Sequence, residues 1–157
     1  MTNHLLLMAN GAVNNSDVKS FTPCSDCLSI SGASAATGSV PGAPKLTWTL
    51  SGEYTDHFTG NYNWYGRVDY NHLGKFYVDY TNLAYTNAAD LVNVHLGIRD
   101  DALLVEGFVK NLTNNSAPLS AQFNVDVLTY LTPPTGNAIH YALPDKRTFG
   151  VRMKYKF

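Results

Sequence analysis

Apolar and polar residues alternate along several stretches of the chain. This is the pattern of a β-strand, because successive side chains of a strand point to opposite faces. At the C-terminus, Arg152 and Lys154 share one face, and every residue of the opposite face is apolar. The same alternation recurs over residues 45–55, 61–71 and 92–99, so these stretches predict four strands. The apolar face of the last strand consists of Phe149, Val151, Met153, Tyr155 and Phe157.

Two more stretches alternate less cleanly. Residues 102–111 place Leu104 and Phe108 on an otherwise polar face, and residues 5–14 do the same with Leu6 and Met8. Residues 119–131 also alternate. We interpret them as the outer continuation of strand 102–111, resumed after an irregular stretch from Asn111 to Pro118. The sequence therefore predicts an all-β, antiparallel meander of about six strands.

The links between these strands alternate between long and short. The short links are His57–Gly60 and Arg99–Asp101, and the long links are Phe21–Ala43, Leu73–Ala89 and Leu128–Lys146. Outer-membrane barrels have short periplasmic turns and long extracellular loops, whereas a soluble sandwich has no reason to send every long link to one side. This pattern favours a transmembrane β-barrel segment with both chain termini on the periplasmic side.

The number of strands limits how such a segment can exist. A closed barrel needs about 8 strands, and an open sheet in lipid leaves unpaired backbone groups at its edges. Six strands therefore predict either part of a larger barrel or one protomer of a small oligomeric structural outer-membrane protein. A soluble β-sandwich or small barrel that binds a carbohydrate or lipid is the alternative outside the membrane.

The composition of the chain bears on the class of protein and on its partners. Charged residues make up 15% of the 157 residues, below the ~25% of typical soluble domains, and aromatic residues make up 12%. The net charge of -1 offers no polybasic surface, so no nucleic acid partner is expected. There is no apolar run of the ~18 residues that a transmembrane helix needs. No basic residue precedes Leu5–Met8, so no signal peptide is expected.

Five segments carry a resemblance to a known family. They cover about the whole chain, and the most specific are the Lys-Asn-Leu step at Lys110–Leu112 and the alternating strand that ends in an aromatic residue. Together the chain resembles the C-terminal part of TonB-dependent outer-membrane receptors. The segments are 43–54, 67–70, 91–97, 109–114 and 147–157.

This resemblance implies the last strands of a barrel of about 22 strands with a plugged lumen. Such receptors take up ferric siderophores, vitamins such as cobalamin, or saccharides, and the inner-membrane TonB complex drives the uptake. The plug domain has no counterpart in these residues, so contact with the TonB complex is expected only through that missing domain. The implied partners are outer-membrane lipid, the barrel-assembly machinery at the terminal strand 149–157, and a small solute at the three long links.

Few residues suggest chemistry. Cys24 and Cys27 form a lone Cys-x-x-Cys pair, which is half of a zinc site and lacks the βαβ context of a redox motif. A disulfide in an extracellular loop is one interpretation, and two incidental thiols are the other. The five histidines show no metal-ligand spacing, and no nucleophile elbow or phosphate loop occurs. We expect no enzyme, no cofactor and no metal site, and we expect His95 to be a solvated lumen residue.

The aromatic residues and the charges divide between the two faces. In a membrane, the aromatic residues of the apolar parity would form interfacial girdles, and in a soluble barrel they would be core or sugar-stacking residues. They are Trp48, Tyr54, Tyr62, Trp64 and Tyr70. The charges of the opposite parity are expected to line a lumen and to contact the plug. They are Glu53, Arg67, Asp69, Arg99, Arg152 and Lys154.

Overall fold

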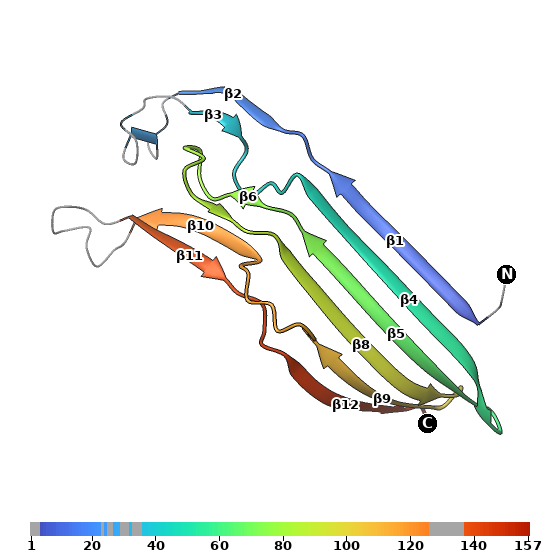
Figure 1. Ribbon diagram of the computed structural model, residues 1–157. Coiled ribbons are helices and arrows are strands. Elements are labelled where there is room, and N and C mark those ends of the chain that lie inside the picture. The colour runs from blue at the N-terminus through green and yellow to red at the C-terminus, as the bar shows by residue number, and fades with distance from the viewer. Residues whose placement is uncertain (1–3, 23, 25–26, 29–31, 33–35, 126–136) are drawn as a thin grey trace.

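A computed structural model describes residues 4–22, 24, 27–28, 32, 36–125 and 137–157. Its main feature is one antiparallel sheet of six long strands, whose spatial order β1-β4-β5-β8-β9-β12 follows the chain order (Figure 1). The all-β class and the meander of six strands are therefore confirmed. The strands are β1 (Leu5–Val13), β4 (Leu46–Thr59), β5 (Tyr62–Leu73), β8 (Ala89–Arg99), β9 (Leu103–Lys110) and β12 (Thr148–Tyr155).

The register joins the apolar residues of all six strands into one face. Directly opposite residues of neighbouring strands point to the same side of a sheet. Gly52 lies opposite both Leu7 of β1 and Val68 of β5, and Val68 lies opposite Val94 of β8. The chain of pairs continues from β8 through β9 to β12 in the same way. The alternation predicted for each strand thus adds up to a sheet with one apolar and one polar face.

The short links close tight turns at one end of the sheet. Gly60, with a φ of 58°, turns the chain from β4 into β5, and Asp100 begins the turn between β8 and β9. β1 begins and β12 ends at this same end, because Leu5 lies opposite Tyr54 and Tyr155 lies opposite Leu103. The start of β1 and the end of β12 therefore lie beside the short turns, as expected (Figure 1).

Three small two-stranded sheets lie at the other end, one between β1 and β4, one between β5 and β8, and one between β9 and β12 (Figure 1). We call these sheets the outer hairpins. The alternation of long and short links is therefore a true asymmetry of the sheet. The outer hairpins pair β2 (Asp17–Phe21) with β3 (Ala36–Ser39), β6 (Phe76–Tyr77) with β7 (Tyr85–Thr86), and β10 (Ser120–Val125) with β11 (Asn137–Ala142).

The interpretation of residues 119–131 as a continuation of strand 102–111 is wrong. β9 ends at Lys110, and β10, which covers the described part of 119–131 except Leu119, belongs to a separate sheet whose other strand, β11, lies within the predicted long link Leu128–Lys146. The cause is a turn at Asn111 and Asn114, whose φ angles of 49° and 52° are left-handed. Asparagine is enriched in that conformation, and the Asn111 side chain stabilises the turn by donating hydrogen bonds to the carbonyls of Asn115 and Asp145.

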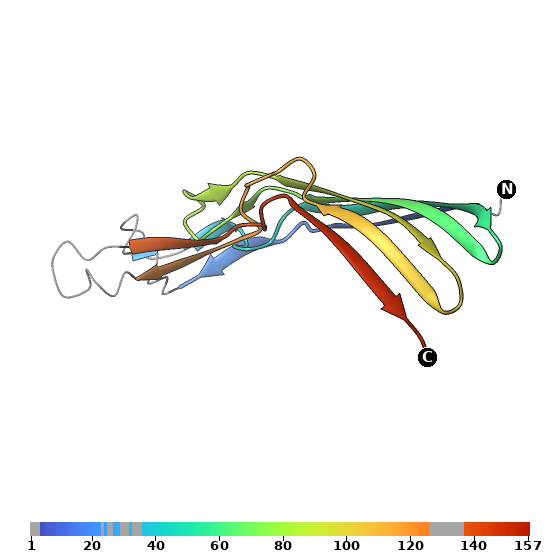
Figure 2. The same cartoon turned by 90° about the horizontal axis from the view of Figure 1, so that it is seen from below.

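The six-stranded sheet is open. Within the described residues, the outer edges of β1 and β12 pair with no other strand. The sheet is bent rather than flat, with β12 turned away from the plane of β1 and β4 (Figure 2). Among the described residues, no helix is long and apolar enough to cross a membrane.

Candidate functional site

The apolar face of the six-stranded sheet is open to its surroundings. Many of its aliphatic side chains are exposed, with Leu96 at 62% and Val151 at 79% of their full accessible surface, and the others are half-buried. A soluble β-sandwich would bury this face under a second sheet, but none of the described strands covers it. Exposed apolar surface of this extent is typical of a surface that contacts another molecule or a membrane.

Aromatic residues mark the two ends of this face. At the end nearer the outer hairpins, the Trp48 ring stacks on Tyr70, with centroids 4.7 Å apart, and on His72 at 5.5 Å. At the turn end, the rings of Tyr54 and Trp64 lie 5.4 Å apart. The aromatic residues predicted as girdles therefore gather at two levels, except that Tyr62 begins β5 just beyond the lower cluster.

The two aromatic levels are separated by most of the length of the strands. Trp64 lies opposite Asp56, which is eight residues along β4 from Trp48. At ~3.3 Å per residue this is about 26 Å along the strand, a stretch of nine residues, and a tilted transmembrane strand has ~9–11 residues. Side chains between the two levels include Leu7, Leu50, Val68, Val94 and Leu96.

Charged residues appear on the apolar face only at these same two levels. At the outer level, Asp90 lies 2.7 Å from His72 Nδ1 and accepts a 2.6 Å hydrogen bond from the Tyr70 hydroxyl. At the turn level, Asp56 lies 3.4 Å from His4 Nδ1. Between these levels, this face of the six described strands carries no Asp, Glu, Lys or Arg. The uncharged band is thus bounded on both sides by polar pairs.

The opposite face carries a hydrogen-bonded network that we call the polar wall. On β5, Arg67 donates two hydrogen bonds of 2.8 and 2.9 Å to Asp69 Oδ1, and the Ser51 hydroxyl on β4 donates to the same carboxylate at 2.5 Å. On β8, Arg99 donates at 2.7 Å to Glu53 of β4, across the intervening strand β5. These bonds tie strands β4, β5 and β8 together through side chains as well as backbone.

Glu106 of β9 is the centre of the polar wall. It is buried, and its two carboxylate oxygens accept a 2.5 Å hydrogen bond from the Tyr65 hydroxyl and a 2.8 Å hydrogen bond from Arg152 of β12. The Tyr65 ring reaches Glu106 by lying across Gly97, and the Arg99 guanidinium lies 4.5 Å from that ring. Side chains from β5, β8, β9 and β12 therefore meet at one buried carboxylate.

His95 is not the freely solvated histidine that the sequence suggested. Its side chain is only 19% exposed and lies between two carboxylates, 3.3 Å from Glu106 and 3.8 Å from Asp69. It thereby joins the β4–β5 part of the polar wall to the β9–β12 part. The predicted lumen charges Glu53, Arg67, Asp69, Arg99 and Arg152 all belong to this network, whereas no ion pair of Lys154 occurs among the described residues.

The polar wall balances its charges internally. Glu53, Asp69 and Glu106 face the three guanidiniums of Arg67, Arg99 and Arg152. Buried carboxylates are stable when paired and hydrogen-bonded in this way. The described part of the chain holds no group of three or more potential metal ligands. The arrangement is a hydrogen-bonded network in which three carboxylates and three guanidiniums neutralise one another.

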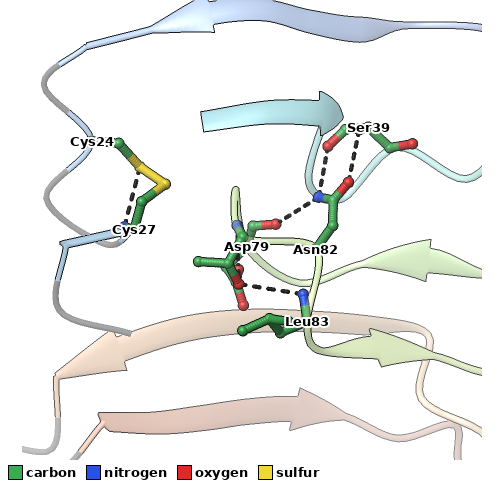
Figure 3. Close-up of a disulfide and its surroundings, with 7 residues drawn as sticks. Cys24, Cys27, Ser39, Asp79, Asn82 and Leu83 are labelled. Carbon is green, nitrogen blue, oxygen red and sulfur yellow. Dashed lines mark hydrogen bonds between the residues drawn. A yellow bond between two sulfur atoms is a disulfide. The ribbon is translucent and has the colours of Figure 1, made fainter. Parts of the chain in front are cut away.

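A third group of residues fastens the outer hairpins to one another. The structure joins Cys24 and Cys27, the candidate disulfide of the sequence, and Val18 and Tyr80 pack against the buried sulfurs (Figure 3). The Asn82 side chain bridges two hairpins, since it accepts a 2.8 Å hydrogen bond from the Ser39 backbone N–H and donates to the Ser39 carbonyl at 3.0 Å (Figure 3). The first two outer hairpins thus pack together at the end of the sheet opposite the short turns.

The structure describes the whole of the predicted terminal strand but only parts of two of the predicted solute-binding links. The terminal strand is exposed along its apolar parity from Phe149 to Tyr155, and Phe157 follows the strand as a fully exposed residue. Of the ranges expected to capture a solute, 21–43 and 128–146 fall in part outside the described residues. Sequence reasoning missed the roles of Tyr65 and Glu106, because only the register shows that two polar-face residues 41 positions apart touch.

Comparisons with protein-family models, with curated proteins and with solved structures find no match to this chain. The resemblance to TonB-dependent receptors therefore stays a prediction from the sequence.

Proposed function

We propose that this chain forms six neighbouring strands of a larger bacterial outer-membrane barrel, and that the barrel is a TonB-dependent receptor for a scarce solute such as a ferric siderophore, a vitamin or a saccharide. The observation that carries the proposal is the uncharged, exposed band between the two aromatic levels of the sheet. Lipid tails are the surroundings that such a band fits.

The physical argument for lipid is energetic. Burying apolar surface is worth roughly 25 cal/mol per Å², so the exposed residues of six strands would be a large cost in water. Arg, Lys, Asp and Glu are costly at the centre of a bilayer, and this face has none there. The His72–Asp90 and His4–Asp56 pairs would lie at the two membrane surfaces, where water solvates them.

The polar wall and the outer hairpins support a receptor. A plugged barrel needs a polar inner wall that contacts the plug, and the polar wall offers exposed guanidiniums, with Arg152 at 60%. The outer hairpins lie together at one end, where they would meet a solute outside the cell. Contact with the TonB complex would go through the plug domain and not through these strands.

The open edges of β1 and β12 support a larger assembly. Unpaired backbone N–H and C=O groups each cost several kcal/mol in hydrocarbon. Further strands must pair with both edges in a membrane, because about 8 strands are needed for the smallest closed barrel. A receptor barrel supplies them within one protein, whereas an oligomeric structural protein would supply them from other copies.

Tryptophan fluorescence tests the membrane part of this proposal. The chain has two tryptophans, both on the apolar face, so the variants Trp48→Phe and Trp64→Phe each leave one probe. The chain is refolded into phosphatidylcholine vesicles whose acyl chains carry bromine either near the headgroup or near the chain end. We expect both tryptophans to be quenched, and more strongly by bromine near the headgroup, since both lie at the aromatic levels.

A water-soluble monomer would contradict the membrane part of the proposal. If the chain folds as a monomer in buffer without lipid, and bromolipid vesicles leave both tryptophans unquenched, the apolar face does not contact lipid and the proposal fails. A detergent-stable oligomer that dissociates on heating would instead favour the small structural outer-membrane protein over the receptor.

Uptake tests the receptor part separately. Disrupting the gene in its host should abolish uptake of one class among radiolabelled ferric siderophores, cobalamin and oligosaccharides, while uptake of the other classes continues. Unchanged uptake of every class would argue against a receptor, even where the fluorescence experiment supports a membrane wall.

A further inference from the structure

A pocket of about 270 Å³ lies where the strands β4 and β5 give way to the outer hairpins. Two segments that are far apart in the sequence form it, the link that enters β4 and the link that leaves β5. Its lining includes Ser39, Lys45, Leu46, Lys75, Phe76 and Tyr77. Neither the polar wall nor the apolar band includes this pocket.

Backbone hydrogen bonds hold the two segments together on both sides of the pocket. The Gly42 N–H donates to the Tyr77 carbonyl at 2.9 Å, and the Gly74 N–H donates to the Leu46 carbonyl at 2.8 Å. Gly74 permits this approach, because a Cβ there would lie 2.6 Å from the Leu46 carbonyl oxygen. Phe76 is buried beneath them. The pocket is therefore part of the folded structure rather than a gap between loose loops.

Two lysines and no acidic residue are among the described residues that line the pocket. Lys45 and Lys75 both line it, and neither forms an ion pair with a described residue. The Lys75 ammonium lies 3.7 Å from the centroid of the Tyr85 ring and 5.1 Å from that of Tyr77. This cation–π contact restrains Lys75 without consuming a carboxylate, so its charge stays available to a ligand.

We infer that this pocket binds an organic anion, with a phosphate or carboxylate between Lys45 and Lys75 and an apolar group against Leu46 and Phe76. The two ammonium groups supply charge and hydrogen-bond donors, and Ser39 adds a hydroxyl. The aliphatic and aromatic lining favours an anion with an apolar body over a bare inorganic ion. The inference deepens the proposed function, on which the placement of the pocket at the extracellular end rests.

An organic anion that binds in this pocket can come from two sources at a membrane surface. The anion can be a soluble solute on its way into the barrel, or the phosphate headgroup of a membrane lipid. Both would use the same lysines, so the experiment has one arm for the anion and another for its source.

The first arm measures binding to the full chain in neutral maltoside micelles by equilibrium dialysis. The probes are phenyl phosphate, inorganic phosphate and the uncharged benzyl alcohol. We expect phenyl phosphate to bind most tightly, each of Lys45→Met and Lys75→Met to weaken it about threefold, and the double variant about tenfold. Lys19→Met, which removes an exposed lysine from β2, is the matched control and should leave binding unchanged.

The second arm repeats the dialysis in phosphatidylcholine vesicles with and without phosphatidylglycerol. If phosphatidylglycerol competes with phenyl phosphate in the wild type but not in the double variant, the anion is a lipid headgroup. If it does not compete, the anion is a soluble solute. Equal affinity of the wild type and the double variant for phenyl phosphate, with both chains folded by circular dichroism, overturns the inference.

This outcome is independent of the tryptophan experiment. Quenching by bromolipid reports on the apolar face, whereas phenyl phosphate binding in micelles reports on the pocket alone. Each proposal can therefore fail while the other stands.

Discussion

Gly97 on β8 has a position that no larger residue fits. An added Cβ would lie 2.7 Å from the Val105 carbonyl oxygen and 2.8 Å from the Tyr65 ring. We expect Gly97→Ala to lower the free energy of unfolding by about 1–3 kcal/mol, because the Tyr65 ring must move and lose its bond to Glu106. The urea midpoint in micelles measures this. Gly107→Ala is the control, since its Cβ would meet only the Leu96 carbonyl at 3.9 Å, and equal losses in both variants would contradict the explanation.

Leu7 and Met8 are neighbours on β1 whose side chains point to opposite faces of the sheet. Both are exposed apolar residues, but Leu7 shares the face of Gly52 and Met8 shares the face of Ser51. In vesicles we expect Leu7→Lys to cost about 2–4 kcal/mol of stability, as a lysine does at a bilayer midplane, and Met8→Lys to cost much less. Urea unfolding compares the two directly. A sheet with both faces in water would give two similar values, so similarity of the two costs would count against lipid.

At the scale of elements, the turn between β8 and β9 depends on one carboxylate. Asp100 accepts hydrogen bonds from the backbone N–H groups of Leu103 at 2.6 Å and Ala102 at 2.8 Å, and these bonds lower the pKa of Asp100 below its usual value. A lowered pKa in the folded state means that the ionised form stabilises the turn. That contribution is complete above the unfolded pKa of about 3.9 and is lost as the pH falls through the lower, folded value.

Asp100→Asn should therefore lower the urea midpoint at pH 7, and the difference from the wild type should shrink below about pH 4. Asp101→Asn is the control, because Asp101 is exposed and accepts no hydrogen bond within the described residues. A difference between wild type and Asp100→Asn that is the same at pH 7 and at pH 3 would show that the carboxylate charge plays no part in the turn.

The elements also show what could be predicted from the sequence. Alternation located β4, β5, β8 and β12 to within a few residues, because one face of each strand is apolar except near the ends of β4, β5 and β8, where Asp56, His72 and Asp90 lie. It could not locate the outer hairpins. β6 and β7 have two residues each, too few for a period, and the pairing of β10 with β11 depends on the turn at Asn111 rather than on any pattern within β10.

The polar wall was predictable in its members but not in its contacts. Parity alone places Glu53, Arg67, Asp69 and Arg99 on one face. Which carboxylate meets which guanidinium depends on register across three or more strands, and a shift of one residue would reverse every face. The bond from Tyr65 to Glu106 also needs Gly97 between them, which leaves no trace in the hydrophobic pattern.

At the scale of the whole molecule, the six-stranded sheet has two unpaired edges among the described residues. β5 is hydrogen-bonded to β4 on one side and β8 on the other, whereas β1 and β12 are each paired on one side only among the described residues. In hydrogen exchange on the chain in micelles, the amides of β5 should therefore be protected along its whole length. In β1 and β12, every second amide should exchange rapidly, because it points away from the only neighbouring strand.

The protection of β12 also reports on what pairs with its edge. Adding vesicles should leave the pattern of β5 unchanged, since its neighbours are already present. If the alternate amides of β12 become protected at high protein concentration and are released on dilution, copies of the chain have paired edge to edge, as an oligomeric outer-membrane protein requires. If they exchange rapidly at every concentration, the edge awaits strands that copies of this sheet do not provide, which is the behaviour expected of a wall that belongs to a larger receptor barrel.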